Sequence, residues 1–203
     1  MKESYRFYRG CYRFARVLFG IFYRIEVSGK ENIPENAAMV CGNHSSVLDP
    51  IFMAFAFGIE HFLHFVAKVE IFSIPILSSI VKGLGAISVN REASDVATIR
   101  NILAYLKKGE KVVIFPEGTR SLTDDAVSAK SGAVKIAERA KVPVIPVYLP
   151  RKKRLFGKVS MVIGRQIDLD NSGKKRTPEE YLELASGIMD MINALNPDAR
   201  AGL

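Results

Sequence analysis

The sequence predicts an α/β domain in which a mixed central sheet is flanked by helices, preceded by an amphipathic N-terminal helix. Short apolar runs typical of buried strands alternate along the chain with longer segments of helical periodicity. Prolines and glycines separate these segments at short intervals, without an internal repeat or a long linker. The chain has 203 residues, 48% of them hydrophobic, which is enough for one sizeable core.

The first 24 residues form a basic segment rich in aromatic side chains. Apolar residues recur every three or four positions, and arginines follow the same spacing one position later, so a helix would carry two neighbouring stripes. The stripes comprise Tyr5, Tyr8, Tyr12, Ala15, Phe19 and Phe22, and Arg6, Arg9, Arg13 and Arg16. Such a helix either lies in a membrane interface or packs on its own domain with solvated arginines. The apolar patch at residues 17–22 favours the membrane.

The next part of the chain is predicted to alternate strands with helices. Strands are expected at residues 24–27, 37–41 and 62–67. Proline suits the first position of a helix, so the apolar residues 51–57 after Pro50 predict a helix. Pro75 predicts a kinked or broken helix over residues 69–81. His61 and His64 are three apart on a predicted strand and point to opposite faces, which argues against a metal site.

The second half continues the alternation. Expected strands cover residues 86–90, 111–115, 142–149 and 158–163, and expected helices cover residues 94–108, 130–140 and 177–195. Ser94 and Asp95 suit the start of the first of these helices, and Thr177 with the following proline and glutamates starts the last. Pro143 and Pro146 interrupt their strand, so we expect it to be an edge or to carry a bulge.

The formal charge of +8 predicts an anionic partner, which could be nucleic acid, an anionic membrane or a phosphorylated substrate. The two cysteines do not form a disulfide framework, which fits a reducing compartment. No apolar run approaches the ~20 residues of a spanning helix. Arginines punctuate the N-terminal apolar residues, so a cleavable signal is not expected.

The polar loop at residues 43–48 offers the chemistry of a base. On one helix, His44 and Asp49 would lie about 140° out of phase, so they can meet only if His44 precedes the helix. Pro50 at the first helical position and Asp49 at the cap support that geometry. The alternative is a polar loop in which Asp49 merely caps a helix and His44 is incidental.

Other predicted strand ends also carry polar groups, among them Arg91, Glu117 and Arg120, and ligand sites in α/β sheets gather at strand ends. A base beside several cations points to a substrate that has both a nucleophilic hydroxyl and a phosphate.

Four segments resemble motifs of the glycerolipid acyltransferases, in the order of that family. Asn43-His44 with Asp49 resembles the motif N-H-x4-D, and Gly85 to Arg91 resembles Gly-x5-Arg. Residues 115–121, Phe-Pro-Glu-Gly-Thr-Arg-Ser, are similar to the third motif, and residues 142–147 resemble the fourth. The resemblance covers about residues 24–170 and is nearest to the 1-acylglycerol-3-phosphate acyltransferases.

This resemblance implies acyl transfer from a thioester, on acyl carrier protein or coenzyme A, to the 2-hydroxyl of lysophosphatidate, giving phosphatidate without a further cofactor. With the stripes of the N-terminal segment, it predicts two parts: a membrane-associating segment over residues 1–24 and a catalytic domain over residues 25–203. No Gly-x-Ser-x-Gly nucleophile elbow is present, so direct attack by the acceptor is the simpler scheme. His44 would be the base and Asp49 would orient it.

Further site roles are expected from the same motifs. Arg91 and Arg120 would bind the acceptor phosphate, because a guanidinium matches phosphate bidentately, and Lys68 would join them. Glu117 would hydrogen-bond an acceptor hydroxyl. The other residues expected to bind substrate are Asn43, Gly118 and Thr119. Backbone amides near Gly118 or in residues 142–147 are candidate oxyanion donors.

Alternatives remain for several features. Arg91, Arg120 and Lys68 could make only surface ion pairs. Residues 51–57 and 69–81 are either plain core or the lining of an acyl tunnel. The basic run 151–154 is either a solvated cluster or a contact for anionic lipid, acidic carrier protein or coenzyme A phosphates.

Competing functions are acylation of another lysolipid or of glycerol 3-phosphate, and non-catalytic binding of anionic lipid. No nucleic-acid module is evident. We expect peripheral or monotopic attachment to the cytoplasmic face of the cell membrane.

Overall fold

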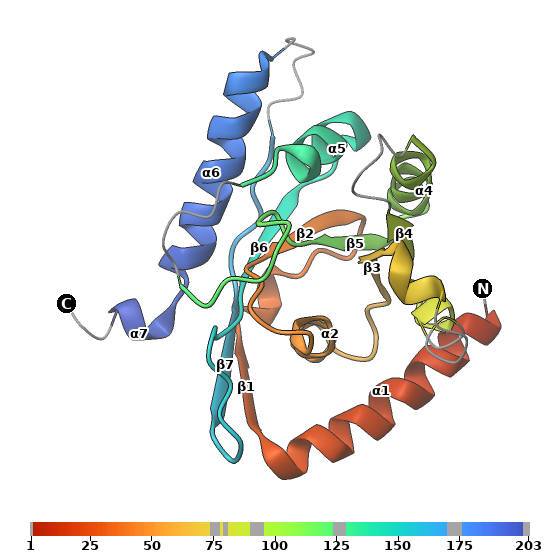
Figure 1. The fold of residues 1–203 in the computed structure, drawn as a ribbon, viewed down its shortest axis with the longest axis vertical. Helices are drawn as coiled ribbons and strands as arrows, with labels where there is room; N and C mark the ends of the chain where they lie inside the picture. Colours follow the sequence, from red (N-terminus) through yellow and green to blue (C-terminus); the bar gives the residue numbers. More distant parts are fainter. Residues whose placement is uncertain are drawn as a thin grey trace.

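A seven-stranded sheet runs through the protein (Figure 1). The structure is a computed structural model that describes residues 2–73, 78, 81–89, 96–123, 129–169 and 176–200. The strand order is β1-β7-β6-β2-β5-β3-β4. The strands are β1 (Arg24–Ser28), β2 (Ala38–Gly42), β3 (Leu63–Lys68), β4 (Ile87–Val89), β5 (Lys111–Ile114), β6 (Val144–Tyr148) and β7 (Lys158–Ile163).

The strand directions confirm the predicted mixed sheet. Strands β6, β2, β5, β3 and β4 are mutually parallel, whereas β7 is antiparallel to β6 and parallel to β1. The carboxyl ends of the five parallel strands therefore meet at one edge of the sheet, where the predicted site loops emerge.

Helices cover both faces of the sheet, as predicted. They are α1 (Lys2–Phe22), α2 (Asp49–Phe57), α4 (Val96–Lys107), α5 (Gly132–Ala140), α6 (Pro178–Ala194) and the short α7 (Pro197–Arg200), with 3-10 turns η1 (Lys30–Asn32) and η2 (Val69–Ser73). Helices α4, α5 and α6 lie on one face, and α1 and α2 lie on the other (Figure 1). No helix of the described chain is long and apolar enough to cross a bilayer.

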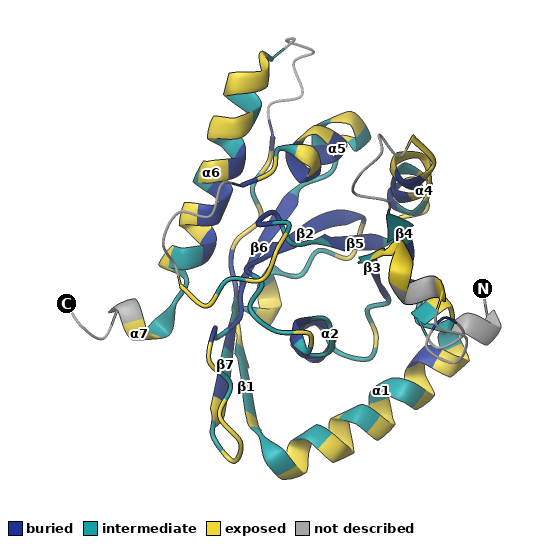
Figure 2. Ribbon diagram, viewed as in Figure 1, coloured by how far each residue is buried: buried dark blue, intermediate teal, exposed yellow. Residues whose placement is uncertain are grey.

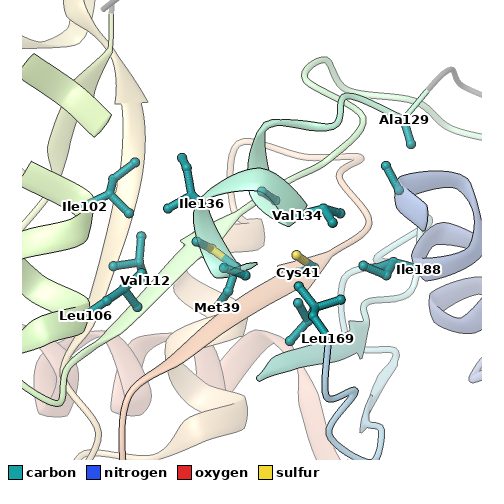
Figure 3. Close-up of a cluster of buried hydrophobic side chains, with 14 of the residues drawn as sticks. Met39, Cys41, Ile102, Leu106, Val112, Ala129, Val134, Ile136, Leu169 and Ile188 are labelled. Carbon is teal, nitrogen blue, oxygen red and sulfur yellow. The ribbon is translucent and has the colours of Figure 1, made fainter. Parts of the chain in front are cut away.

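Alternation along β2 divides the interior into two cores. Met39 and Cys41 point into the cluster formed with α4, α5 and α6 (Figure 3), whereas Ala38 and Val40 point into the cluster formed with α2. Because both faces are covered, the central strands are buried along their whole length (Figure 2). This burial fixes the register of β2 and therefore the place where its polar loop leaves the sheet.

Strand β6 is not an edge strand, although its prolines allowed that prediction. It lies between β7 and β2. Val147 pairs with Ile163, but Val144 pairs with Ile167, so the opposite segment has one extra residue between the two pairs. The irregularity lies opposite Pro146, which has no N–H to donate, and Gly164 still donates to the Pro146 carbonyl (2.8 Å). The expected bulge is thus on the partner segment.

Helix α1 packs against the domain with the stripe that we had expected to meet a membrane. Tyr8 is buried, and Phe19 makes edge-to-face contacts with Phe52 and Phe55 of α2. The membrane interpretation of this stripe was therefore wrong, because aromatic area that could enter a bilayer fills the space beside α2 instead. A different face of α1 is exposed, formed by Phe7, Phe14, Val17, Leu18 and Ile21.

Candidate active site

Three loops at the carboxyl edge of the parallel strands build the candidate site. They follow β2 (residues 43–48, the His44 loop), β5 (residues 115–121) and β6 (residues 149–154). The N–H of Ser121 donates to the carbonyl of His44 (2.8 Å), and the N–H of His44 donates to Glu117 Oε1 (3.3 Å). The first two loops are thus joined through their backbone at the residue that we expected to be the base.

His44 and Asp49 meet as their spacing predicts. His44 Nδ1 lies 2.8 Å from Asp49 Oδ2, and the same oxygen accepts the backbone N–H groups of Ser45 (2.6 Å) and Ser46 (2.7 Å). The imidazole stacks on Phe115, with 4.2 Å between ring centroids, and its side chain is 17% exposed. With Nδ1–H held by Asp49, Nε2 carries the lone pair that can take a proton.

Asp49 is the first residue of α2, and Leu48 holds the N-cap position that we had assigned to Asp49. Its carboxylate folds back over the loop instead of capping the helix, because two loop amides and the imidazole all converge on one of its oxygens. The N-terminus of α2 therefore carries the buried carboxylate of Asp49, and the helix dipole favours a negative group at that end.

Lys153 approaches the other oxygen of Asp49. Its Nζ lies 2.6 Å from Asp49 Oδ1, and the Lys153 side chain is only 5% exposed. Burial alone would raise the pKa of Asp49, but the hydrogen bond from His44 and the positive charge of Lys153 outweigh it and lower that pKa below its ordinary value. Asp49 is therefore ionised in the site, where it favours the tautomer of His44 with a proton on Nδ1.

A second buried ion pair involves Glu117 of the 115–121 loop. Glu117, whose side chain is fully buried, receives Arg151 Nη2 on Oε1 (2.9 Å) and Arg151 Nη1 on Oε2 (3.4 Å). Arg151 also donates to the carbonyl of Ser121 (2.9 Å). The Glu117 carboxylate is thus occupied inside the protein in this conformation, whereas we had expected it to face an acceptor hydroxyl.

Asn43 joins two strand ends. Its side-chain amide donates to the carbonyl of Leu149 (2.7 Å) and accepts the N–H of Leu149 (2.8 Å), and Asn43 has no exposed surface. The expectation that Asn43 binds substrate is therefore not met here, since both ends of the amide are used. Asn43 instead fixes the His44 loop to the loop after β6.

The expected phosphate-binding residues lie at the surface of the same edge. Thr119 and Arg120 are exposed at the end of the loop after β5, and Lys68 is exposed at the end of β3. Lys68 pairs in register with Val89, the last residue of β4. Arg91 lies outside the described residues.

Several of the backbone amides proposed as oxyanion donors are already used. Gly118, whose φ of +65° suits glycine, donates its N–H to Phe115 in a tight turn (3.0 Å). Val142 and Val144 donate to Ala137 and Ile167. In residues 142–147, the two prolines have no N–H, and the remaining amides belong to a strand paired on both sides. An interior strand has no amides to spare, so the expectation fails for residues 142–147.

Sequence reasoning missed Arg151 and Lys153 as parts of the site. Within the basic run 151–154, Arg151 and Lys153 turn inward while Lys152 and Arg154 are exposed, so the solvated-cluster interpretation holds for only half of it. The alternation has the period of an extended chain. This alternation, just after a buried strand, was the signal in the sequence that could have identified Arg151 and Lys153.

Two other expectations concern the apolar helix α2 and the histidines near β3. Residues 52–57 of α2 pack in the core, which agrees with the plain core interpretation. His64 is buried, with Nδ1 2.8 Å from the Gly85 carbonyl and Nε2 2.5 Å from Glu110 Oε2, and its ring stacks on Tyr105. In the described chain, no cluster of three or more His, Cys, Asp or Glu residues could hold a metal.

Comparison with known proteins agrees with this geometry. A family model described as "Acyltransferase" matches residues 24–150, and the chain belongs to this acyltransferase family. The 1-acyl-sn-glycerol-3-phosphate acyltransferase of Bacillus subtilis is 32% identical over 93% of this chain and 96% of its own length. The enzyme of that name from Borreliella burgdorferi is 30% identical over 75% of this chain and 61% of its own length.

The fold is also that of a solved relative. The crystal structure of the 1-acyl-sn-glycerophosphate (LPA) acyltransferase from Thermotoga maritima superimposes with a TM-score of 0.65 and 27% sequence identity. The superposition covers 95% of this chain and 79% of that one.

Proposed function

We propose that this protein transfers a fatty acyl group from a thioester to the 2-hydroxyl of 1-acyl-sn-glycerol 3-phosphate and so makes phosphatidate. The observation that carries the proposal is the His44–Asp49 pair, in which a buried carboxylate holds Nδ1 of a partly exposed imidazole. Exposed cations lie at the same edge of the sheet, as a phosphate-bearing acceptor requires. The similarity to enzymes with this printed activity supports the same choice.

The proposed reaction needs one base and no acyl-enzyme. His44 Nε2 removes the proton from the acceptor 2-hydroxyl as that oxygen attacks the thioester carbonyl. The tetrahedral intermediate then collapses, the carbon–sulfur bond breaks, and the imidazolium returns the proton to the leaving thiolate. A positioned base typically contributes about 10²- to 10⁴-fold to such a step, and Asp49 stabilises the imidazolium between the two transfers.

Lys68, Arg91 and Arg120 form the proposed acceptor-phosphate site, together with Thr119. Glu117 supports this site indirectly, because its buried pair with Arg151 holds the loop that carries Arg120. Either acyl carrier protein or coenzyme A can deliver the acyl group, since both are anionic and the protein has a formal charge of +8.

Helix α1 attaches the protein to an anionic membrane in this proposal, through the face that the domain leaves uncovered. Phe14 is 73% exposed in the middle of that face. Beside the end of α1, in the turn before β7, Phe156 is also exposed (75%), and its ring lies 5.9 Å from that of Phe22. The arginines of α1 supply attraction to anionic lipid of about 1 kcal/mol each. The lipid acceptor favours peripheral attachment at the cytoplasmic face.

The decisive assay supplies purified protein with lysophosphatidate and with either acyl-coenzyme A or acyl carrier protein, and measures phosphatidate. Parallel reactions with glycerol 3-phosphate and other lysolipids identify the acceptor. His44→Ala should abolish turnover while leaving folding intact, and Asp49→Asn should cost less but still orders of magnitude. Turnover that survives in His44→Ala would reject His44 as the base. Lipid binding without turnover on any acceptor would favour the non-catalytic alternative.

A further inference from the structure

The Lys153 ammonium lies close to three oxygen atoms inside the site. Its Nζ contacts Asp49 Oδ1 (2.6 Å), the carbonyl of Pro150 (2.6 Å) and Ser45 Oγ (3.2 Å). The ammonium also lies 5.8 Å from the centre of the Phe52 ring. Two of these contacts are hydrogen bonds, and the contact with Asp49 is an ion pair outside hydrogen-bond geometry, so charge attraction joins Lys153 to Asp49. A lysine held in this way differs from the mobile, hydrated lysines of a protein surface.

We propose that Lys153 is a positioning residue for the base: it anchors the oxygen of Asp49 that His44 does not use, and thereby sets the orientation of His44 and its tendency to hold a proton. The effect on turnover rests on the proposed acyl transfer, whereas the effect on the His44–Asp49 hydrogen bond does not.

The orientation argument follows from the two oxygens of Asp49. Oδ2 receives the imidazole and two backbone amides, whereas the contact that the structure shows for Oδ1 is with Lys153. A buried carboxylate that loses its cation is strongly destabilised, so it must rotate or draw in water. Either movement weakens the hydrogen bond to His44 Nδ1, on which the orientation of Nε2 depends.

The charge argument concerns the groups that face His44. Asp49 comes from α2, Glu117 and Arg120 come from the loop after β5, and Arg151 and Lys153 come from the loop after β6. The Glu117 and Arg151 charges oppose each other, as do those of Asp49 and Lys153. Where the Asp49 carboxylate stays in place without Lys153, its unbalanced charge favours the protonated imidazole. A base that is already protonated cannot accept the acceptor's proton.

The test compares Lys153→Met with Lys152→Met, because Lys152 is the exposed neighbour and the change in net charge is the same. The first readout is the low-field NMR signal of the His44 Nδ1 proton, which requires no substrate. We expect this signal to broaden or move in Lys153→Met and to stay unchanged in Lys152→Met. Lys153→Arg should retain it, because a guanidinium can still reach a carboxylate.

The second readout is the pH profile of kcat/KM. In Lys153→Met, its acidic limb should move to higher pH by about one unit, since a nearby charge typically shifts a titration by one unit or more. Turnover near pH 7 should fall by about tenfold or more and partly recover as the pH rises, with little change in KM for lysophosphatidate. Lys152→Met should follow the unmodified protein.

Three results would overturn the proposal. Equal effects of the two methionine variants would show that only net charge matters. A loss confined to KM for the acceptor would make Lys153 a substrate contact. An unchanged Nδ1 signal and acidic limb in Lys153→Met would show that Asp49 needs no anchor.

If Lys153→Met does not fold, Lys153→Gln takes its place in the same comparison. If no form of the protein turns over any acceptor, the proposed function fails, and the NMR comparison still decides the role of Lys153.

Discussion

Individual residues in the site are held by buried charges in opposed pairs. Asp49 at the start of α2 pairs with Lys153, and Glu117 in the loop after β5 pairs with Arg151, so both acids meet a base on the loop after β6. Such pairs recover the cost of leaving water only with good geometry, so they are weak evidence for stability. Their clearer effect is on position: each pair fixes one part of the site relative to the loop after β6 and so restricts the movement of the His44 imidazole.

Arg120→Ala should weaken binding of the acceptor far more than binding of the acyl donor. A charged hydrogen bond contributes roughly 1.5–3 kcal/mol, or about 10- to 150-fold in apparent affinity. The measurement is KM for lysophosphatidate and for the thioester, with Arg165→Ala as the control. Arg165 is equally exposed but follows β7, whose carboxyl end lies at the opposite edge of the sheet. A loss confined to the donor would move the phosphate site elsewhere.

The sequence predicts the His44–Asp49 contact because it depends on local geometry, namely a turn followed by a proline at a helix start. It does not predict that Asn43, Glu117, Arg151 and Lys153 would be buried. The partners that fix them lie 34 to 108 residues away in the chain. Those contacts depend on which strands become neighbours, and periodicity within a segment contains no information about that order.

Among the elements, α1 shows how a correct periodicity can assign the wrong face. The helix carries two apolar faces, separated by arginines on one side, and a sequence pattern cannot tell which of them its own domain covers. The more aromatic stripe packs on α2. The face with Phe7, Phe14, Val17, Leu18 and Ile21 is left exposed. The prolines also led us to allow an edge position for β6. The strand lies inside the sheet, because the segment paired with it accommodates the N–H that Pro146 lacks.

Phe14→Ser combined with Ile21→Ser should release the protein from anionic vesicles without unfolding it. Each large apolar side chain contributes about 1.5–3 kcal/mol when it leaves water, so the partition coefficient should fall by at least tenfold. Co-sedimentation with vesicles measures this. The control is Leu182→Ser, which removes an exposed apolar side chain (46% exposed) from α6, on the other face of the sheet. Unchanged sedimentation of the double variant would place the membrane contact elsewhere.

Gly29→Ala should destabilise the protein more than Gly109→Ala. Both glycines have positive φ, of +78° and +84°, so alanine costs about 1–2 kcal/mol of backbone strain at either. Only at Gly29 would the added Cβ collide with a backbone atom, 1.9 Å from the carbonyl oxygen of Ile163 at the end of β7. Chemical denaturation should show the larger loss at Gly29. Equal losses would mean that β1 can move away from β7 at no cost.

In the whole molecule, the two cores and the helices on each face follow from patterns in the sequence. The apolar runs, the helix starts and the loop lengths each predict a local element. The alternation of strands with helices predicts a sheet whose faces are covered by helices. Strand order was not predictable in the same way, because the pairing of β6 with β7 and β2 is decided by which arrangement buries both faces. The position of the site at one edge then follows from the shared direction of five strands.

Cys41 should resist alkylation until the whole domain unfolds, whereas Cys11 should react in the native state. Cys41 is fully buried in β2 at the centre of the sheet, and burial raises the pKa of its thiol to about 12. Only the thiolate reacts, so at pH 8 both access and ionisation protect it. Cys11 is partly exposed on α1. Labelling followed by mass spectrometry would contradict this if Cys41 reacted as fast as Cys11 in folded protein.

The position of β1 at the end of the sheet has a consequence for the order of events during synthesis. In the described sheet β1 pairs with β7 alone, in a register that matches Arg24 with Lys158, about 130 residues later in the chain. At roughly 5–20 residues per second, a ribosome needs about 7–27 s to make that partner. During much of this interval α1 is already made while the strand that follows it is unpaired, so the proposed membrane-contacting face exists before the site is assembled.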